Sequence, residues 1–301
     1  MRAVLFHNPE AGEADHSRKS LMALLGKAEF STTYCSTRGS DFPEMLEEKA
    51  DVFVAAGGDG TVAKVLRGMP DRSIPVAILP LGTANNIARS LGIAGSPKDV
   101  VAGLAKARRQ RFDIGLACGP WGQRVFVEAV GLGPLTEAMS RIDAVGIERS
   151  DGVRIGRDTF RKVLSEASPI RVNLSIDGRP LSDDMLLVEI LNIPIAGPGL
   201  AFVPEGGVGD GLFDIVCIEP GRRADMLAWL GATQQTVPPP VSLQQGRKIN
   251  LNWEGIPLRI DDHCPTMSKK GVKVTVEVAS EAATIHVPQA GTGERRPRRR
   301  K

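Results

Sequence analysis

The chain has 301 residues, of which 42% are hydrophobic and 24% are charged, and its formal net charge is +3. This balance is typical of a folded globular protein and excludes a largely disordered one. The length allows two domains with cores of their own. The charge is too small to indicate a nucleic-acid partner, so we expect none.

No run approaches the roughly 20 apolar residues that a transmembrane helix needs, and residues 1–6 are apolar too briefly for a signal peptide. We therefore expect a cytoplasmic protein. The four cysteines are far apart and form no Cys-x-x-Cys pair, so we expect them to be reduced and not to bind zinc. The sequence does not determine an oligomeric state.

The first hundred residues alternate between strand and helix patterns. Strands are expected over residues 3–6, 30–35, 52–56 and 76–79, and helices over a segment ending at 26 and over 42–49, 61–67, 84–91 and 97–108. The runs 52–56 and 76–79 are apolar throughout, which is typical of strands buried on both faces of a parallel sheet. Residues 1–110 are therefore predicted to form an α/β domain with an open, mostly parallel sheet, whose ligands bind at the carboxyl ends of the strands.

The pattern changes after Arg109. Short strands separated by turns that contain Gly and Pro are expected over 124–130, 170–176, 185–191, 212–218, 248–251, 258–260 and 272–278, with one helix over 225–234. Residues 111–282 are therefore predicted to form a β-rich antiparallel sandwich. A last strand over 283–288 could return to the first domain.

Residues 289–301 form a basic tail that we expect to be disordered. Six cations and one acid lie within residues 294–301. Such a run gains about 1 kcal/mol per cation near an anionic membrane. The sequence leaves open whether the tail contacts a membrane or only aids solubility.

The segment Gly57-Gly58-Asp59-Gly60-Thr61 lies between a buried strand and the start of a helix. Glycines let backbone N–H groups approach a phosphate, and a helix N-terminus carries about half a positive charge. Thr61 is expected to supply a hydroxyl and a helix cap. An acid such as Asp59 would repel phosphates unless a divalent cation intervenes, so we interpret it as a partner of Mg²⁺ or as a group acting on an acceptor hydroxyl. The alternative is a tight turn capped by an aspartate.

A second loop, Pro80-Leu81-Gly82-Thr83-Ala84-Asn85-Asn86, makes the same kind of connection after the next strand. Two such loops on adjacent strand–helix units are typical of two walls of one nucleotide site. The sequence has no Gly-x-x-x-x-Gly-Lys-Ser/Thr loop and no Gly-x-Gly-x-x-Gly after its first strand, which argues against the P-loop and Rossmann alternatives.

These two motifs resemble the diacylglycerol kinase catalytic domain family, which includes bacterial lipid kinases and sphingosine kinases. The matching segments are 57–61 and 78–93. Weaker matches extend the resemblance over nearly the whole chain, namely Asn8-Pro9, Phe112-Asp113-Ile114-Gly115, Pro204-Glu205 and Asp210-Gly211.

The resemblance implies a two-domain kinase that binds ATP and Mg²⁺ between its domains. It would transfer the γ-phosphate to the hydroxyl of diacylglycerol or a related lipid, in peripheral contact with the inner face of the membrane. By position, the nucleotide contacts would be Asn8, Thr37, Gly57, Gly58, Asp59, Gly60, Thr61 and Thr83. Asp210, with backbone carbonyls near Gly207 and Leu212, would bind a magnesium ion. Asp261 matches the family's catalytic acid, and Asp59 would organise the ATP-bound Mg²⁺.

The chain departs from the family pattern at several of these positions. Asp262 and His263 replace the glycine and glutamate that follow the catalytic acid, Asn86 stands where many relatives have aspartate, and Lys64 where glutamate is usual. Two alternatives to a lipid kinase are therefore kept. One is an enzyme like NAD kinase, which shares the Gly-Gly-Asp-Gly-Thr loop, although its usual downstream motifs are absent here. The other is a nucleotide- or lipid-binding module with weakened catalysis.

Simpler structural roles also stay open for single residues. Asp261 could be a turn acid, Asp210-Gly211 a hairpin turn, and Asp113 a group that satisfies buried backbone.

Overall fold

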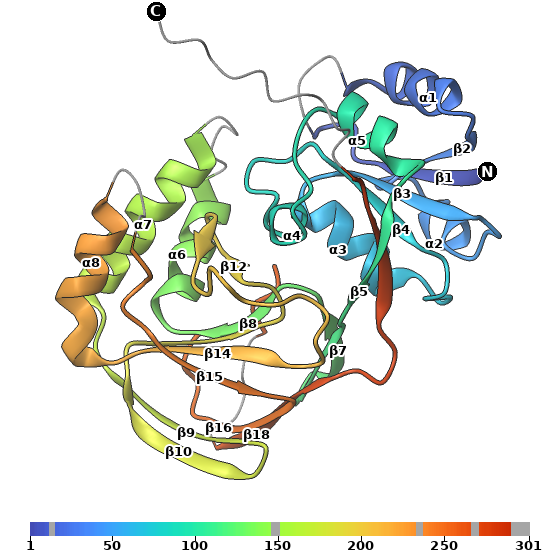
Figure 1. The fold of residues 1–301 in the computed structure, drawn as a ribbon. Helices are drawn as coiled ribbons and strands as arrows, with labels where there is room; N and C mark the ends of the chain where they lie inside the picture. Colours follow the sequence, from blue (N-terminus) through green and yellow to red (C-terminus); the bar gives the residue numbers. More distant parts are fainter. Residues whose placement is uncertain (12–15, 146–150, 233–236, 266–270, 290–301) are drawn as a thin grey trace, which may run out of the picture.

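The computed structural model describes residues 1–11, 16–145, 151–232, 237–265 and 271–289 (Figure 1). The part of the basic tail from residue 290 onward lies outside them. Within the described residues, no helix is long and apolar enough to cross a membrane.

The first lobe is built on a six-stranded sheet with the order β2-β1-β3-β4-β19-β5. Its first four strands in the chain run parallel to one another: β1 Arg2–His7, β2 Ser31–Ser36, β3 Val52–Gly57 and β4 Val76–Pro80. Every residue of β3 is buried. Figure 1 shows helices on both sides of the sheet, which is why this strand lacks a polar face.

The helices of this lobe connect successive strands. They are α1 Arg18–Lys27, α2 Phe42–Met45, α3 Asp59–Gly68, α4 Asn86–Ser90 and α5 Pro97–Leu104. Ser96 caps α5 in a capping box with Asp99, as its position before Pro97 indicated. A helix was predicted over 42–49, but α2 ends at Met45. The N–H groups of Leu46 and Glu47 donate to the carbonyls three residues earlier, those of Pro43 and Glu44, and these tighter bonds end the helix.

The sheet is completed by two strands from distant parts of the chain. β19, Ala283–Val287, pairs in parallel with β4 and antiparallel with β5, Arg108–Phe112. The prediction of helix to residue 108 was wrong, because pairing with β19 draws this segment into the sheet. Figure 1 shows β19, in red, running from the second lobe into the first sheet. The domain boundaries at 110, 282 and 288 stay predictions.

The second lobe contains two antiparallel sheets, which confirms the predicted sandwich. One has the order β10-β9-β16-β18-β6-β7 and the other β15-β14-β11-β8-β17. The strands of the first are β6 Gly115–Gly119, β7 Gly122–Phe126, β9 Ile170–Ile176, β10 Arg179–Met185, β16 Lys248–Trp253 and β18 Val272–Val278. Those of the second are β8 Ala129–Leu132, β11 Leu187–Leu191, β14 Phe213–Ile218, β15 Ser242–Gly246 and β17 Leu258–Ile260.

Strand β11 shows how the second sheet is covered on both faces. Val188 and Ile190 face the core between the two sheets, whereas Leu187 and Leu191 belong to a second core formed with helices. Those helices are α6 Pro134–Val145, α7 Gly152–Glu166 and α8 Arg223–Gly231, and Figure 1 shows them side by side. Helices α6 and α7 were not predicted from the sequence.

Two predicted strands are each divided in the structure. The segment 124–130 becomes β7 and β8, which lie in different sheets, and residues 127–128 cross between them. The segment 185–191 is divided at Leu186, between β10 and β11. A short hairpin, β12 Ile195–Ala196 and β13 Leu200–Ala201, faces α4 of the first lobe (Figure 1).

Candidate active site

The carboxyl ends of the parallel strands gather most of the predicted nucleotide contacts. Asn8 follows β1 and donates its N–H to the carbonyl of Ala56 at 3.0 Å, while Thr37 follows β2 and donates to the carbonyl of His7 at 2.9 Å. Gly57 ends β3 at the same edge. Because parallel strands end together, Asn8, Thr37 and Gly57 lie along one edge of the sheet although they are far apart in the sequence. We call this edge the rim.

The two glycine-rich loops touch through their backbones. A Cβ atom added at Gly82 would lie 2.4 Å from the Cα of Gly58, so a side chain there would push the loops apart. Leu81 donates its N–H to the carbonyl of Gly57 at 2.9 Å. Asn85, in the left-handed region with φ of +49°, closes the second loop through two hydrogen bonds with the backbone of Gly82. Thr83 is exposed within this loop.

The helix that follows β3 begins earlier than expected. Gly58 is the N-cap of α3 and Asp59 its first residue. Thr61 is therefore not the cap. It is buried in the first turn, where its side chain fills the space beside Gly57 that a Cβ atom would need. In α3, Thr61 and Val62 already donate to the carbonyl of Gly58, at 3.0 and 3.2 Å. The N–H groups of Asp59 and Gly60 have no intrahelical acceptor, so α3 brings these two donors to the rim.

Asp59 ties the two loops together. Its Oδ1 accepts a hydrogen bond from the N–H of Ile87 at 2.9 Å, at the start of α4. Burial raises the pKa of Asp59, against the opposing effect of N–H donors from Ile87 and Asn86. The aspartate thus caps the neighbouring helix, and this bond employs only one of its two oxygens.

Asp261 lies on the sandwich side, in a tight turn with φ of +49°. Ile260 and His263 close this turn through N–H to carbonyl bonds of 2.8 and 2.9 Å. Asp261 is 4% exposed, and its carboxylate accepts N–H donors from residues 127, 128 and 129 at distances from 2.8 to 3.2 Å. Burial raises its pKa and these donors oppose the rise. Asp261 therefore holds the segment that crosses between the two sheets.

Arg67 connects this turn to the first lobe. From α3, its Nη1 lies 2.9 Å from Oδ1 of Asp262 and 3.6 Å from Oδ2 of Asp261. Asp262, at the position of the family's glycine, thus forms an ion pair between the lobes.

A buried ion pair between Arg259 and Glu189 supports the turn that contains Asp261. Arg259 donates through Nη2 to Glu189 at 3.0 Å and through Nη1 to the carbonyl of Asp261 at 2.8 Å. The arginine side chain is 7% exposed and that of the glutamate 0%. Neither residue was predicted from the sequence, although each is the one charged residue within an otherwise apolar strand.

Glu128 was also missed, and it brings a further carboxyl group to this region. Its Oε2 lies 3.4 Å from Nδ2 of Asn86, and the same Nδ2 donates to the carbonyl of Gly197 at 2.9 Å. Burial raises the pKa of Glu128 well above its ordinary value, and the charges of Asp59 and Asp261 raise it further. Asn86 is 3% exposed, and its Oδ1 has no hydrogen-bond partner among the described residues.

The predicted metal residues Gly207, Asp210 and Leu212 lie in the loop between β13 and β14. Oδ1 of the exposed Asp210 accepts the N–H of Leu212 at 3.0 Å, as in a simple turn. Buried Asp113 accepts from the N–H of Gly211 at 2.5 Å and ties the loop to the junction of the lobes. Across the described residues, no group of three or more His, Cys, Asp or Glu side chains could hold a metal ion.

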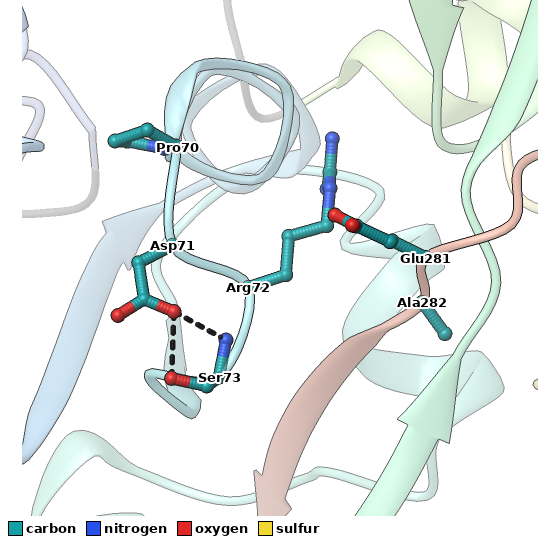
Figure 2. Close-up of a pocket in the computed structure, with 6 residues that line it drawn as sticks. All are labelled: Pro70, Asp71, Arg72, Ser73, Glu281 and Ala282. Carbon is teal, nitrogen blue, oxygen red and sulfur yellow. Dashed lines mark hydrogen bonds between the residues drawn. The ribbon is translucent and has the colours of Figure 1, made fainter.

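A separate hollow of about 560 Å³ lies at the amino ends of β4 and β19, opposite the rim, and Figure 2 shows the residues that line it: Pro70, Asp71, Arg72, Ser73, Glu281 and Ala282. The Asp71 carboxylate accepts from the N–H and the hydroxyl of Ser73 at 2.9 and 2.6 Å, which lowers its pKa. Asp71 is engaged within its own turn, and the charge of Glu281 acts on Arg72. The rim is therefore kept as the candidate active site.

Known proteins match both lobes. Residues 2–117 match the family described as diacylglycerol kinase catalytic domain, and residues 156–291 match the YegS C-terminal NAD kinase beta sandwich-like domain. A probable YegS-like lipid kinase of Pseudomonas putida is 30% identical over 216 residues, which are 69% of this chain and 70% of the relative. The chain belongs to this family of lipid kinases. The resemblance seen in the two glycine-rich motifs is confirmed.

Further relatives agree with this assignment. The diacylglycerol kinase of Bacillus subtilis is 25% identical over 245 residues, covering 75% of this chain and 76% of the relative. A solved structure of a putative diacylglycerol kinase from Bacillus anthracis superposes with a TM-score of 0.73 at 20% identity, over 96% of this chain and 95% of that one. That likeness confirms the fold.

Proposed function

We propose that the chain is an ATP-dependent kinase that phosphorylates the hydroxyl of diacylglycerol or a closely related lipid. The observation that carries the proposal is the contact between the two glycine-rich loops at the carboxyl ends of β3 and β4, close to carboxyl groups from both lobes. Membership in a family of lipid kinases supports it.

In this proposal the rim binds the triphosphate. The N-terminus of α3, carrying about half a positive charge, and the side-chain-free backbone of Gly58 and Gly60 suit a phosphate chain. Asn8, Thr37, Gly57, Thr61 and Thr83 supply the surrounding contacts. Phosphoryl transfer needs mainly positioning and neutralised charge, which such a site offers.

The residues at the rim also fit a magnesium ion bound with the nucleotide. Mg²⁺ prefers oxygen donors and keeps several waters. Asp59 has an oxygen beyond the one bonded to Ile87, and the buried Oδ1 of Asn86 lacks a partner. Asp59 would hold the ion through one oxygen or through its waters. When bound, Mg²⁺ neutralises charge on the β- and γ-phosphates. We also propose a second magnesium site at Asp210, with the carbonyls of Gly207 and Leu212.

A direct assay tests the proposal. The purified chain is incubated with Mg²⁺ and ATP labelled at the γ-phosphate, in mixed micelles that contain diacylglycerol, other glycerolipids or sphingosine, and separately with NAD. We expect labelled lipid that disappears with EDTA. Label on NAD alone would favour the enzyme like NAD kinase, and ATP binding without any transfer would favour the binding module.

A further inference from the structure

Arg67 ties helix α3 of the first lobe to the turn that follows β17 in the second. It lies in the last turn of α3, and its Nη1 donates a hydrogen bond of 2.9 Å to Oδ1 of Asp262. The other ion pairs between described residues join groups within one lobe or, as with Arg111 and Asp113, groups two residues apart at the junction. Arg67 is therefore the described cation that links side chains across the two lobes.

Helix α3 carries this contact near one end and the rim at the other. Asp59 is its first residue, and at about 1.5 Å per residue Arg67 lies about 12 Å further along the axis. The residues between them that face the core are buried, namely Thr61, Val62, Ala63, Val65 and Leu66. The helix is thus fixed on the first sheet, and whatever Arg67 binds is placed relative to the rim.

The turn that Arg67 contacts is the one that carries Asp261. Oδ2 of Asp261 lies 3.6 Å from the same Nη1, which is beyond hydrogen-bond distance. The oxygens of this carboxylate accept the N–H groups of residues 127–129 instead. The side chain of Asp261 is 1% exposed and that of Asp262 67%. Asp262 thus takes the hydrogen bond of this nitrogen, and Asp261 receives only its charge.

The energy of this pair is small, but its position is sensitive. An exposed ion pair contributes up to about 1 kcal/mol to stability. A misplacement of reacting groups by about 1 Å, in contrast, can cost about 100-fold in rate. Asp262 stands where the family has glycine, which has no side chain to bind Arg67. The contact is therefore a property of this chain's own sequence.

We propose that Asp262, acting through Arg67, is a positioning residue for phosphoryl transfer, an inference that rests on the proposed kinase function. The pair holds the turn that carries Asp261 against the helix whose first residues face the phosphates. It thereby sets the distance between Asp261 and the transferred phosphate. When the pair is broken, other contacts still join the lobes, such as that from Asn86 to the carbonyl of Gly197, but the turn is no longer held to α3.

The test uses two variants of Asp262 and a matched control. Asp262→Ala removes the carboxylate, so kcat for lipid phosphorylation should fall about 10-fold, while the Kd of ATP by direct titration stays within about twofold. Asp262→Glu keeps the charge and should retain most of the wild-type kcat. Asp184→Ala breaks an exposed pair with Arg171, between β9 and β10, and should behave like wild type. Urea unfolding checks that each variant is folded.

A double-mutant cycle tests whether Asp262 acts through Arg67. Arg67→Gln alone should lower kcat at least as much as Asp262→Ala, because it also removes the charge beside Asp261. Adding Asp262→Ala to Arg67→Gln should lower kcat by less than about twofold further, since the partner is already gone. A full additional loss of about 10-fold would give Asp262 a role independent of Arg67, and this result overturns the inference.

Other outcomes also overturn the inference. Wild-type kcat in folded Asp262→Ala excludes a positioning role, and so does an Asp262→Glu variant as slow as Asp262→Ala. A parallel loss of ATP affinity and turnover assigns the pair to nucleotide binding instead. In each of these cases the wild-type chain still phosphorylates lipid, so the proposed function stands. If the wild type transfers phosphate to no lipid, the proposed function fails, and this inference fails with it.

Discussion

The two sides of the site use backbone N–H groups in opposite ways. On the first lobe, Gly58 and Gly82 bring two loops into contact and leave the first donors of α3 without a helical partner. On the second lobe, Asp261 already occupies three N–H groups with its own carboxylate. In the proposed function the first side receives an anion from a ligand, whereas the anion on the second side belongs to the protein itself.

This difference predicts different costs for losing an acid. If the aspartate on the first side serves the ligand, as proposed, its loss should reduce catalysis more than stability. On the second side, removing the charge leaves buried donors without a partner, so stability should fall as well.

The largest expected effect is that of Asp59→Asn. The asparagine carbonyl can still accept the N–H of Ile87, so the protein should remain folded with little loss of stability. Lipid phosphorylation should fall by about two orders of magnitude or more, because a charge near the transferred phosphate is lost. Initial rates and urea unfolding measure both quantities. Near-normal turnover would restrict Asp59 to capping α4.

Asp261→Asn should reduce stability more than Asp59→Asn. Its amide would direct N–H groups at the donors of residues 127–129, so we expect the unfolding free energy to fall by about 2–4 kcal/mol. If Asp261 positions the site, kcat should also fall while ATP affinity barely changes. Asp262→Asn, which breaks an exposed pair, should cost less than about 1 kcal/mol. Equal stabilities of the two variants in urea would contradict this account of the turn.

Two glycine variants separate packing from ligand binding. Gly82→Ala should lower the unfolding free energy by about 1–3 kcal/mol, because its Cβ would lie 2.4 Å from the Cα of Gly58. Gly60→Ala meets no atom within 4 Å and lies in a helix, so stability should stay the same or rise by up to about 1 kcal/mol. ATP affinity should nevertheless fall in Gly60→Ala. Unchanged affinity there would argue against a phosphate at the start of α3.

The titration of Glu128 predicts a smaller, pH-dependent effect. The pKa of Glu128 is raised in the folded state. Its contribution to stability is therefore fully present below its pKa in the unfolded chain, and this contribution is lost as the pH rises through its pKa in the folded protein. Glu128→Gln lacks this loss. Its stability relative to wild type should therefore increase from pH 4 toward neutrality, by about 1.4 kcal/mol per unit of pKa shift. Urea unfolding with chelator and without nucleotide measures this, and a difference constant with pH would contradict it.

The smallest expected effect concerns the basic tail, which lies outside both sides of the site. Deletion of residues 294–301 should weaken binding to anionic vesicles at low salt and matter little at high salt, because the attraction fades within a Debye length of ~8 Å at physiological ionic strength. Turnover of a short-chain soluble acceptor should not change. Equal sedimentation of full-length and truncated protein with vesicles at low salt would leave the tail a solvated end.

The sequence by itself determined the features that depend on neighbouring residues. The apolar run at 52–56 predicted a strand buried on both faces, and Ser96 before Pro97 predicted the start of α5. The two glycine-rich loops identified the rim and the family, because a loop that approaches phosphate requires glycine at fixed positions.

Only the tertiary structure decided features that depend on distant partners. Arg108–Phe112 is a strand because Ala283–Val287 returns to pair with it. Asp261 meets the N–H of Glu128 across 133 positions of the chain, and the amide of Asn86 reaches the same glutamate from the other lobe. Local patterns carry no information about such contacts, because each requires both lobes to be folded and packed together.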